Sequence, residues 1–476
     1  MNRFTTSLTT LGAAALLAAC ANLAPEYQRP APPVPATWPG AAAPASGSTA
    51  EIAWQEFFVD ARLRDVIASA LANNRDLRKA ALRIDQARAL YQVDRAERFP
   101  TVDAAAGMTA QRTPAGLSSS GQRETTRQYE ASIGFARYEL DLFGRVRNLN
   151  EQALQAFFAT EQARRSVQIS LVAEVANTWL TLAADRERLL LARRTFESQN
   201  ASYTVIRRRF DLGATSQLDL RRAQTTVDAA RADLARFTSL VAQDENALAL
   251  LVGAPVPGAA LPDALSAAVS LSDVPTGLPS DVLQRRPDIL EAEHRLQAAH
   301  AVIGQARAAF FPSVTLTGAA GVASGELSEL FRGGAGAWSF VPRVSLPIFD
   351  GGRNRATLQA AQAGREIAVA DYERAIQSAF REVADALSVR GSLGQRLDAQ
   401  QSLVEAAADS HRLSEIRFRE GAESYLAVLD AQRSLYEAEQ GLISVRLSRL
   451  ANLVTLYKVL GGGWSEPVDS GRPRSS

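Results

Sequence analysis

The sequence predicts an α+β membrane protein whose protomer is internally duplicated, with long coiled-coil helices and four β-strands. A sixteen-residue phrase occurs twice, 208 positions apart, as RFDLGATSQLDLRRAQ from Arg209 and RFREGAESYLAVLDAQ from Arg417. Before each phrase lie two short segments that alternate apolar and polar residues, and then a very long segment with helical apolar spacing. Each half therefore reads as helix, β-hairpin, very long helix, tip and returning helix.

The amino-acid composition excludes several classes of protein. With 52 basic and 51 acidic residues the chain has a formal charge of +1, so nothing favours binding to nucleic acid. A single Cys excludes an internal disulfide framework and a Cys-based metal cluster. The three His residues, His294, His300 and His411, form no HExxH motif or catalytic triad, and there is no P-loop motif. We therefore expect neither an enzyme nor a bound cofactor or metal ion.

The N-terminus has the pattern of a lipoprotein signal peptide over residues 1–19. Arg3 supplies a positive start, and the apolar run from Leu8 to Ala19 is too short to span a bilayer as a mature helix. The sequence LAAC, ending at Cys20, resembles the bacterial lipobox, in which cleavage precedes the Cys and the thiol receives a lipid. We expect Cys20 to carry acyl chains such as palmitate, each buried CH2 contributing about 0.8 kcal/mol to membrane binding. The alternative is an ordinary secretory signal with an incidental Cys.

The first repeat is predicted over residues 51–252, after a Pro- and Ala-rich extended tether over residues 20–50. Residues 48–99 contain no Gly or Pro and have helical apolar spacing, which predicts one long helix ending at Pro100. Alternation of apolar and polar residues then predicts a β-hairpin over residues 101–138.

A long helix hairpin completes this repeat. The 68 residues from Arg145 to Leu212 lack Gly and Pro and carry a 4-3 apolar seam typical of a coiled coil. Gly213 predicts the end of that helix, at a tip over residues 211–216, and the chain returns as a helix over residues 214–252.

The second repeat is predicted over residues 285–460, after a connector over residues 253–284 and before a flexible tail over residues 461–476. Its elements follow the same order: a helix over 287–310, a β-hairpin over 313–347, a long helix from Arg353, a tip over 419–424 and a last helix over 424–460. The last helix carries two apolar heptad tracks, so we expect it to contact two neighbouring helices. A closed tube of helices requires such contacts.

Four strands with alternating faces cannot close a barrel, and open sheet edges do not occur in lipid. If the strands cross a membrane, several copies of the chain must share one barrel, and a tube of helices that continues it is a conduit. The alternative is a periplasmic sheet packed on helices, because the β-barrel pattern is weak in any single strand.

Four segments carry a family resemblance. They are RRPDILEAEHRLQAAHAVIGQARAAFFPSVTLTG from Arg285, YELDLFGRVRN from Tyr138, LPIFDGGRNRA from Leu346 and YLAVLDAQRSLYEAEQ from Tyr425. Together they resemble the TolC-like outer-membrane factors, most closely the NodT-type lipoprotein branch that serves resistance-nodulation-division efflux pumps. The resemblance covers the chain from Cys20 to about Trp464, and Ala21 is similar to the residue that follows the Cys in lipoproteins of the outer membrane.

The resemblance implies a homotrimer, with a twelve-stranded β-barrel in the outer membrane of a Gram-negative bacterium and a periplasmic α-helical barrel below it. It implies the exit duct of a tripartite efflux pump, which conducts drugs or other small toxic compounds passively. The implied partners are a periplasmic adaptor protein and an inner-membrane resistance-nodulation-division transporter. A duct for metal efflux or type I protein secretion has the same fold and stays open as an alternative, as does a non-channel periplasmic coiled-coil scaffold.

The resemblance also implies a gate at the periplasmic end, opened by an iris-like movement of the tips. The family's constriction corresponds to Leu426 and Asp430, with Arg433 one turn along, and Asp219 matches a position that links neighbouring helices in the closed state. Three Asp430 carboxylates around an axis would favour cations and repel one another. The alternative is an Asp430–Arg433 surface pair worth a few tenths of a kcal/mol. Glu423 stands where some relatives carry Arg, which puts the cross-link in doubt.

The two tips are also the expected docking points for the adaptor. The residues concerned are small or helix-capping, and they are Gly213, Ala214, Ser216, Gly421, Ala422 and Ser424. The alternative is that any antiparallel helix pair needs Gly and Ser at its turn. Duplication of the whole phrase favours contact with a partner.

Overall fold

The computed structural model describes residues 22–38, 52–265, 271 and 280–463. The predicted signal peptide 1–19, Cys20 and residues 464–476 of the predicted tail lie outside the described residues. By its internal contacts the chain forms two compact units. The first contains Ile84–Thr160, Glu291–Tyr372 and the N-terminal segment up to Ala31; the second contains Pro32–Arg83, Glu161–Leu290 and the chain from Glu373 onward.

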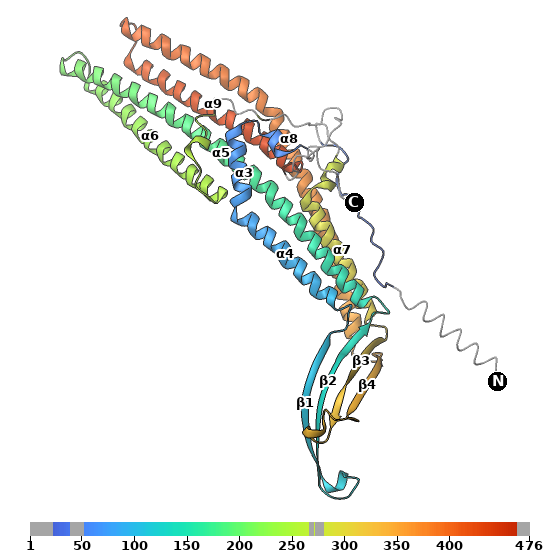
Figure 1. The fold of residues 1–476 in the computed structure, drawn as a ribbon. Helices are drawn as coiled ribbons and strands as arrows, with labels where there is room; N and C mark the ends of the chain where they lie inside the picture. The colour runs from blue at the N-terminus through green and yellow to red at the C-terminus, as the bar shows by residue number, and fades with distance from the viewer. Residues whose placement is uncertain (1–21, 39–51, 266–270, 272–279, 464–476) are drawn as a thin grey trace, which may run out of the picture. The chain divides into compact units, whose positions relative to one another are not determined.

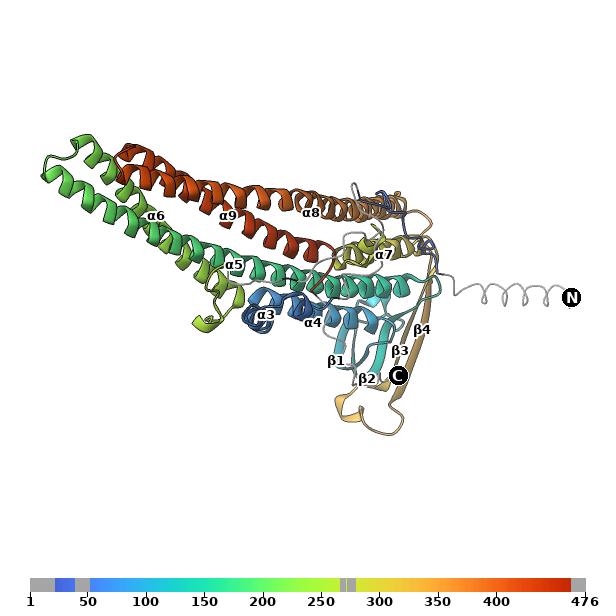
Figure 2. The ribbon, with the colours of Figure 1, turned by 90° about the horizontal axis from the view of Figure 1, so that it is seen from above.

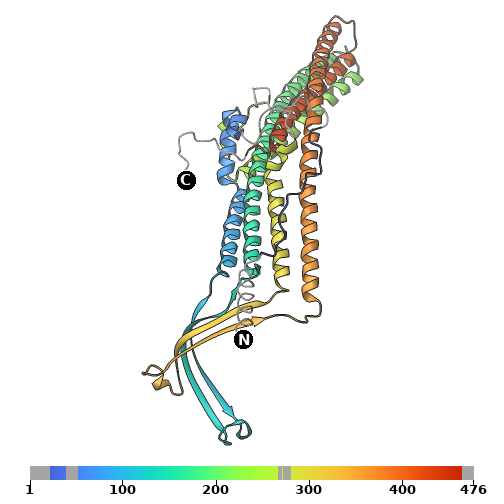
Figure 3. The ribbon, with the colours of Figure 1, turned by 90° about the vertical axis from the view of Figure 1, so that its right-hand side faces the viewer.

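The first unit contains one four-stranded antiparallel sheet in the order β1-β2-β3-β4. Its strands are β1 Val102–Thr113, β2 Glu124–Leu140, β3 Ser313–Ser324 and β4 Gly336–Ser345. Two of the three pairings are the hairpins expected from alternation, and pairing of β2 with β3 joins the two repeats. Figure 3 shows the four strands curving side by side. The outer edges of β1 and β4 pair with no other strand among the described residues.

The strand register gives the sheet one apolar face and one small or polar face. Paired residues share a face, so a line across the sheet joins Val102, Phe135, Gly318 and Phe340, and the line two residues along joins Ala104, Ile133, Ala320 and Trp338. The opposite face carries Asp103, Gly134, Ala319 and Ser339 on one line, and Ala105, Ser132, Gly321 and Ala337 on another. The sheet therefore has the two-sided character of strands that separate lipid from a lumen.

A β-bulge marks the end of the sheet that leads into the helices. The β2–β3 register shifts between Phe135 and Tyr138, and Arg137 adopts a φ of 56°. The Arg137 N–H donates to Thr317 Oγ1 at 3.2 Å, and the Tyr138 hydroxyl donates to the Arg98 carbonyl at 3.1 Å. The bulge bends β2 where it continues toward α5.

The helices of the two repeats match in length. They are α4 Arg75–Ala96, α5 Arg145–Asp211, α6 Gln217–Val252, α7 Pro287–Ala308, α8 Arg353–Arg419 and α9 Tyr425–Val459. The long helices α5 and α8 have 67 residues each, and α4 and α7 have 22 each. In Figures 1 and 2, α6 returns beside α5 and α9 returns beside α8. The predicted duplication is thereby confirmed. Short 3-10 helices occur in the loops and connectors, as η2 Ala115–Leu117, η3 Gly258–Ala260, η4 Ser280–Arg285 and η5 Leu327–Glu329.

Much of the apolar seam predicted for the first long helix is buried. Its buried members are Leu171, Val175, Leu182, Asp185, Ala192, Gln199 and Ile206. The one acidic member, Asp185, is paired with Arg188 at 2.6 Å, which explains how a carboxylate is accommodated there. Both heptad tracks of α9 also contribute buried residues, Leu429 and Val454 on one and Val428 and Leu456 on the other. An 18-residue window of α5 is apolar enough to cross a membrane, but 67% of it is buried, as in a core helix.

The prediction of one helix over residues 48–99 was wrong. Over the described residues 52–99 the chain forms three helices, α2 Trp54–Phe57, α3 Ala61–Asn73 and α4. Asp60 and Asn74 have extended backbones, and each side chain caps the helix that follows: Asp60 accepts from the N–H groups of Arg62 and Leu63, and Asn74 from those of Asp76 and Leu77. Asn74 also donates to the Leu251 carbonyl at 2.7 Å. Capping side chains can therefore divide a helical pattern that contains no Gly or Pro.

The described part of the predicted tether, residues 22–38, forms no helix or strand, but it is packed against helices. In the first unit, Arg29 donates to both carboxylate oxygens of Glu293 on α7, at 2.7 and 2.6 Å, and the Tyr27 hydroxyl donates to the same group at 3.0 Å. In the second unit, Trp38 is 4% exposed and stacks on Phe380 with ring centroids 4.5 Å apart. This segment therefore contributes to the packing of both units.

Candidate functional site: the paired helix tips

The first tip, residues 211–216, closes α5 with a left-handed glycine. Gly213 has a φ of 73°, and its N–H donates to the Phe210 carbonyl at 2.9 Å. The Ala214 N–H donates to the Arg209 carbonyl at 2.7 Å. These two bonds form a Schellman motif, which satisfies carbonyls that the end of a helix leaves free.

The second tip, residues 419–424, closes α8 in the same way. Gly421 has a φ of 75°, its N–H donates to the Phe418 carbonyl at 3.1 Å, and the Ala422 N–H donates to the Arg417 carbonyl at 2.8 Å. The repeated phrase therefore encodes one helix C-cap twice. Its Arg, Phe, Gly and Ala hold equivalent positions in the two motifs.

The tips differ in how the returning helix begins. In the first tip, Ser216 Oγ accepts from the Asp219 N–H at 3.1 Å, while Asp219 Oδ2 accepts from the hydroxyls of Ser216 at 2.6 Å and Thr215 at 3.1 Å. The backbone N–H of Ser216 also bonds to this carboxylate, which makes the arrangement a capping box with Asp at its third position. These hydrogen bonds, led by the one from Ser216, hold the pKa of Asp219 below its ordinary value. The carboxylate that the family resemblance assigns to a cross-link is thus bonded within its own tip.

In the second tip, Ser424 makes no side-chain hydrogen bond to the N-terminus of α9. Glu423 instead accepts from Arg417 Nε at 2.9 Å, so its carboxylate is also bonded within its own tip. The same phrase therefore gives one hydrogen-bonded helix start and one without a side-chain cap. The difference lies at residues that the two copies of the phrase do not share.

The two helix hairpins pack on each other behind the tips. The buried residues of this cluster are Ile206, Ala223, Tyr425, Val428 and Leu429, with Tyr203, Leu220 and Phe418 packed against them. Phe418 contacts the Tyr425 ring at a centroid distance of 5.4 Å, and the Arg209 guanidinium lies 5.6 Å from the centroid of Phe418. This cluster holds the ends of the four helices α5, α6, α8 and α9 together.

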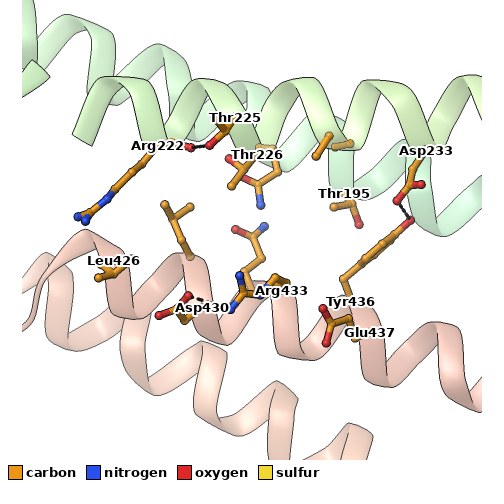
Figure 4. A pocket seen from close by; sticks show the side chains of 15 residues that line it. Thr195, Arg222, Thr225, Thr226, Asp233, Leu426, Asp430, Arg433, Tyr436 and Glu437 are labelled. Carbon is orange, nitrogen blue, oxygen red and sulfur yellow. Dashed lines mark hydrogen bonds and ion pairs between the residues drawn. The ribbon is translucent and has the colours of Figure 1, made fainter. Parts of the chain in front are cut away.

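A cavity of about 500 Å³ lies beside this cluster, lined by residues of α5, α6 and α9. The predicted gate residues Leu426, Asp430 and Arg433 all line it, together with Arg222 and Asp233 of α6. Figure 4 shows Arg222 extending from α6 toward α9, where Leu426 lies. Asp219, the fourth predicted gate residue, is not among the lining residues. The structure thus brings three of the four together.

The sequence profile of the outer membrane efflux protein family matches residues 66–254 and 278–462. The chain belongs to this family. TtgC of Pseudomonas putida, described as a probable efflux pump outer membrane protein, is 46% identical over 99% of both chains. A membrane protein from Pseudomonas aeruginosa, solved by crystallography, superposes with a TM-score of 0.89 at 43% identity, covering 93% of this chain and 98% of that one. The open state of the Neisseria gonorrhoeae MtrE outer membrane channel superposes with a TM-score of 0.85 at 37% identity, over 93% and 99% of the two chains.

Membership of this family makes the chain an efflux component of the outer membrane of a Gram-negative bacterium. The family is one of transport proteins and not of enzymes. No group of three or more His, Cys, Asp or Glu among the described residues could hold a metal ion.

Asp430 and Arg433 form the surface pair that sequence reasoning gave as the alternative to a gate. Arg433 Nη2 donates to Asp430 Oδ1 at 3.2 Å, and the side chains are 70% and 56% exposed, respectively. Such an exposed pair contributes a few tenths of a kcal/mol to stability. A contribution of this size leaves the Asp430 carboxylate free to respond to another charge.

A second polar contact in the cavity was not predicted. The Tyr436 hydroxyl donates to Asp233 Oδ2 at 3.0 Å, joining α9 to α6, and burial raises the pKa of Tyr436 to about 12. Asp233 also pairs with Arg236 at 3.1 Å. In the sequence, Tyr436 is one member of the apolar heptad tracks of the last helix. The one available signal was that a Tyr hydroxyl on a helix seam needs a hydrogen-bond partner.

We predict that Gly213→Ala and Gly421→Ala each destabilise their own tip. A Cβ at either position meets no atom within 4 Å, so the cost is that of a left-handed Ala, about 1–2 kcal/mol. Amide hydrogen exchange at the tip should become about 5- to 30-fold faster. The control is Gly391→Ala in α8, where a Cβ also meets nothing and φ is helical, so exchange should slow or stay unchanged. Unchanged exchange in the two tip variants would contradict the cap assignment.

Proposed function

We propose that the chain is the outer-membrane exit duct of a tripartite efflux pump and that three copies form it. The observation that carries this proposal is the open four-stranded sheet with its two unlike faces. Three copies pool twelve strands into one closed barrel. The helices that continue the strands form the tube between the barrel and the periplasmic tips.

The edges of the sheet support a shared barrel. β1 has twelve residues and β4 has ten, each about the length of a strand that crosses a bilayer. Their outer edges expose N–H and C=O groups, and each unpaired group costs several kcal/mol in lipid. β1 and β4 are antiparallel to their partners throughout, so β4 of one copy can pair antiparallel with β1 of the next.

The proposed cargo is taken from the compounds named in the descriptions of related proteins. Two relatives from Pseudomonas putida, each 46% identical over 99% of this chain, are described as an antibiotic efflux protein and a toluene efflux protein. We extend this class, small organic toxic compounds, to the present duct. With no nucleotide-binding motif in the sequence, the energy for transport comes from an inner-membrane transporter of the resistance-nodulation-division type.

The gate in this proposal is the constriction around Leu426 and Asp430. Three copies of the tip bring three Asp430 carboxylates toward one axis, where they attract cations and repel one another. Repulsion favours an iris-like opening of the tips once a partner binds them. Asp219 stabilises its own helix start, so its part in closure is to keep the first tip rigid.

The first test is conduction in planar lipid bilayers. The purified protein should give discrete ion-conducting steps, whereas a non-channel scaffold gives none. Asp430→Ala should raise the resting single-channel conductance and lower the preference for cations, because three side chains at the constriction become shorter and uncharged.

The control for that variant is Asp409→Ala. Asp409 forms a pair with Arg412 on α8 at the same 3.2 Å and the same three-residue spacing, but it does not line the cavity. Its conductance should equal that of the parent protein. Equal conductance for Asp430→Ala and the parent would remove the gate assignment and leave the duct.

The adaptor is proposed to bind at the two tips. The residues concerned are all exposed, and they are Gly213, Ala214, Ser216, Gly421, Ala422 and Ser424. With the adaptor co-expressed, a short cross-linker attached at Ala214→Cys or Ala422→Cys should capture it. Leu117→Cys, 81% exposed in the loop between β1 and β2, is the control and should capture none. Failure at both tip positions would count against this contact.

Lipid attachment is proposed at Cys20. The mature N-terminal peptide should begin at Cys20 and carry the mass of diacylglycerol and a further acyl chain. A Cys20→Ser variant should lose that mass and stay unprocessed at this site. An unmodified Cys20 in the mature outer-membrane protein would mean that the barrel alone holds it there.

A further inference from the structure

We propose that Ile348 and Phe349 of one copy pack against Phe99 of the next copy, as an apolar clasp where the sheet passes into the helices. The proposal rests on the proposed function, because it needs β4 of one copy to pair with β1 of its neighbour. It adds the register of that pairing and the side chains that seal its end.

Ile348 and Phe349 are 95% and 93% exposed, the highest values among the large hydrophobic side chains of the described residues. Both lie shortly after β4, beyond Leu346 and Pro347, on the way to α8. Burial of a side chain of this size contributes about 1.5–3 kcal/mol, so leaving two adjacent ones in water is costly. Their exposure in one copy points to a partner outside it.

The segment that presents them is held in place. Asp350 Oδ1 accepts from the Gly352 N–H and its Oδ2 accepts from the Asn354 N–H, both at 2.9 Å. Asn354 Nδ2 donates to the Ala309 carbonyl at 2.9 Å, just after α7. The turn after Phe349 is therefore fixed to its own copy, and its two apolar side chains have a defined position.

The opposite edge of the same unit exposes a matching set. Phe99 is 66% exposed just before β1, Val102 is 59% exposed at its start, and Val93 is 65% exposed on α4. α4 is fixed to α5 of its own copy, because Asn150 Nδ2 of α5 donates to the Asp94 carbonyl at 3.0 Å. Each copy thus presents apolar side chains on both edges of its sheet, at the end that leads into the helices.

The two edges fit each other in one register. Full pairing of the ten residues of β4 within the twelve of β1 places Ser345 opposite Val102, Asp103 or Ala104. Only Asp103 keeps the apolar face of β4 on the same side as that of β1, because a slip by one residue exchanges the faces. Phe340 then lies opposite Met108. Phe349 is four residues beyond Ser345 and Phe99 is four residues before Asp103, so the same number of residues leads from the last strand pair to each.

The strand tilt implied by this register agrees with a membrane barrel. Within one copy, the line straight across the sheet runs from Val102 to Phe340. In the proposed register Phe340 lies opposite Met108 of the next copy, which is six residues further along β1 than Val102. Six residues are about 20 Å along a strand, and four strand spacings are about 19 Å. The resulting tilt of about 45° is that of membrane-spanning strands. An offset of eight residues in place of six would give a strand tilt of about 54°, outside the usual range.

The helices beyond the clasp are compatible with the same pairing. α4 leads into β1 and α8 leads out of β4, so the two helices lie antiparallel across the seam between copies. Val93 and Ala89 of α4 and Ala356 and Ala360 of α8 are all exposed in one copy. Small residues there allow the two helices to approach closely.

Lipid acyl chains are the other apolar partner for Ile348 and Phe349. A second copy is favoured because one register, fixed by strand lengths and faces alone, brings Phe99 to the level of Phe349. An aromatic girdle at the membrane interface would also place Phe99 and Phe349 at one level, and the cross-link described next distinguishes it from contact between copies.

The test is oxidation of the full-length double variant Phe99→Cys/Phe349→Cys in outer membranes. Disulfides between copies require Cα atoms within about 7 Å, and three of them should convert the protein into a covalent trimer on a non-reducing gel. Each single variant should stay monomeric on that gel, which controls for the natural Cys20. The matched pair Phe99→Cys/Leu327→Cys, with Leu327 62% exposed beyond the other end of β4, should also give no trimer.

Light scattering of the same detergent-solubilised variants separates the possible failures. A trimer that gives no cross-link from the Phe99/Phe349 pair overturns the clasp and leaves the duct intact, as expected if these side chains face lipid. A monomeric parent protein, measured in the same way, overturns the proposed function together with the clasp. Equal cross-linking by the Leu327 control pair would also overturn the register. A covalent trimer from the Phe99/Phe349 pair alone supports it.

Discussion

The unpaired outer edges of β1 and β4 are the constraint on which the rest of the structure depends. A four-stranded sheet has two edges whatever its sequence, and in lipid the N–H and C=O groups along them have no water to bond. The apolar face that continues across all four strands makes lipid the surrounding medium. Completion by further copies of the chain is the arrangement that removes both edges at once.

Duplication of one structural unit supplies the strands and helices that this constraint requires. Each repeat contributes one hairpin and one pair of long helices, and helices of 67 residues follow both hairpins. Pairing of β2 with β3 joins the repeats inside one copy. The pairing proposed between β4 and β1 repeats that relation between copies, so six similar repeats surround one axis.

The tips depart from this symmetry, and the departure is local. Both use a left-handed glycine and the same two backbone hydrogen bonds, but only the first has a capping box. The second instead has the Arg417–Glu423 ion pair and, in the first two turns of α9, the Leu426 and Asp430 side chains that line the cavity. The first tip is the more rigidly hydrogen-bonded of the two. The second carries the groups that are suited to respond to charge.

The buried polar contacts of the helix bundle show the limits of reasoning from the sequence. Asp185 lies on an apolar seam because Arg188, one turn away, neutralises it, and this pair is visible in the sequence as a three-residue spacing. Tyr436 bonds to Asp233, which is 203 positions away, and no local pattern identifies that partner. The division of residues 48–99 was missed for a different reason. Asn74 caps α4 and also donates a hydrogen bond to the Leu251 carbonyl of α6. The apolar spacing around Asn74 stays helical, so neither bond can be recognised from the sequence.

By itself, the sequence determined the duplication, the strands, the long helices and the glycine caps, because each follows from spacing or from a backbone conformation that few residues adopt. It also brought Leu426, Asp430 and Arg433 to one region, since residues three and four apart on a helix are neighbours. Only the tertiary structure decided the order and register of the strands, the partner of Tyr436 and the internal bonding of Asp219. These features depend on contacts between backbone and side-chain groups that are far apart in the sequence. No local stretch of the chain determines the free energy of such contacts.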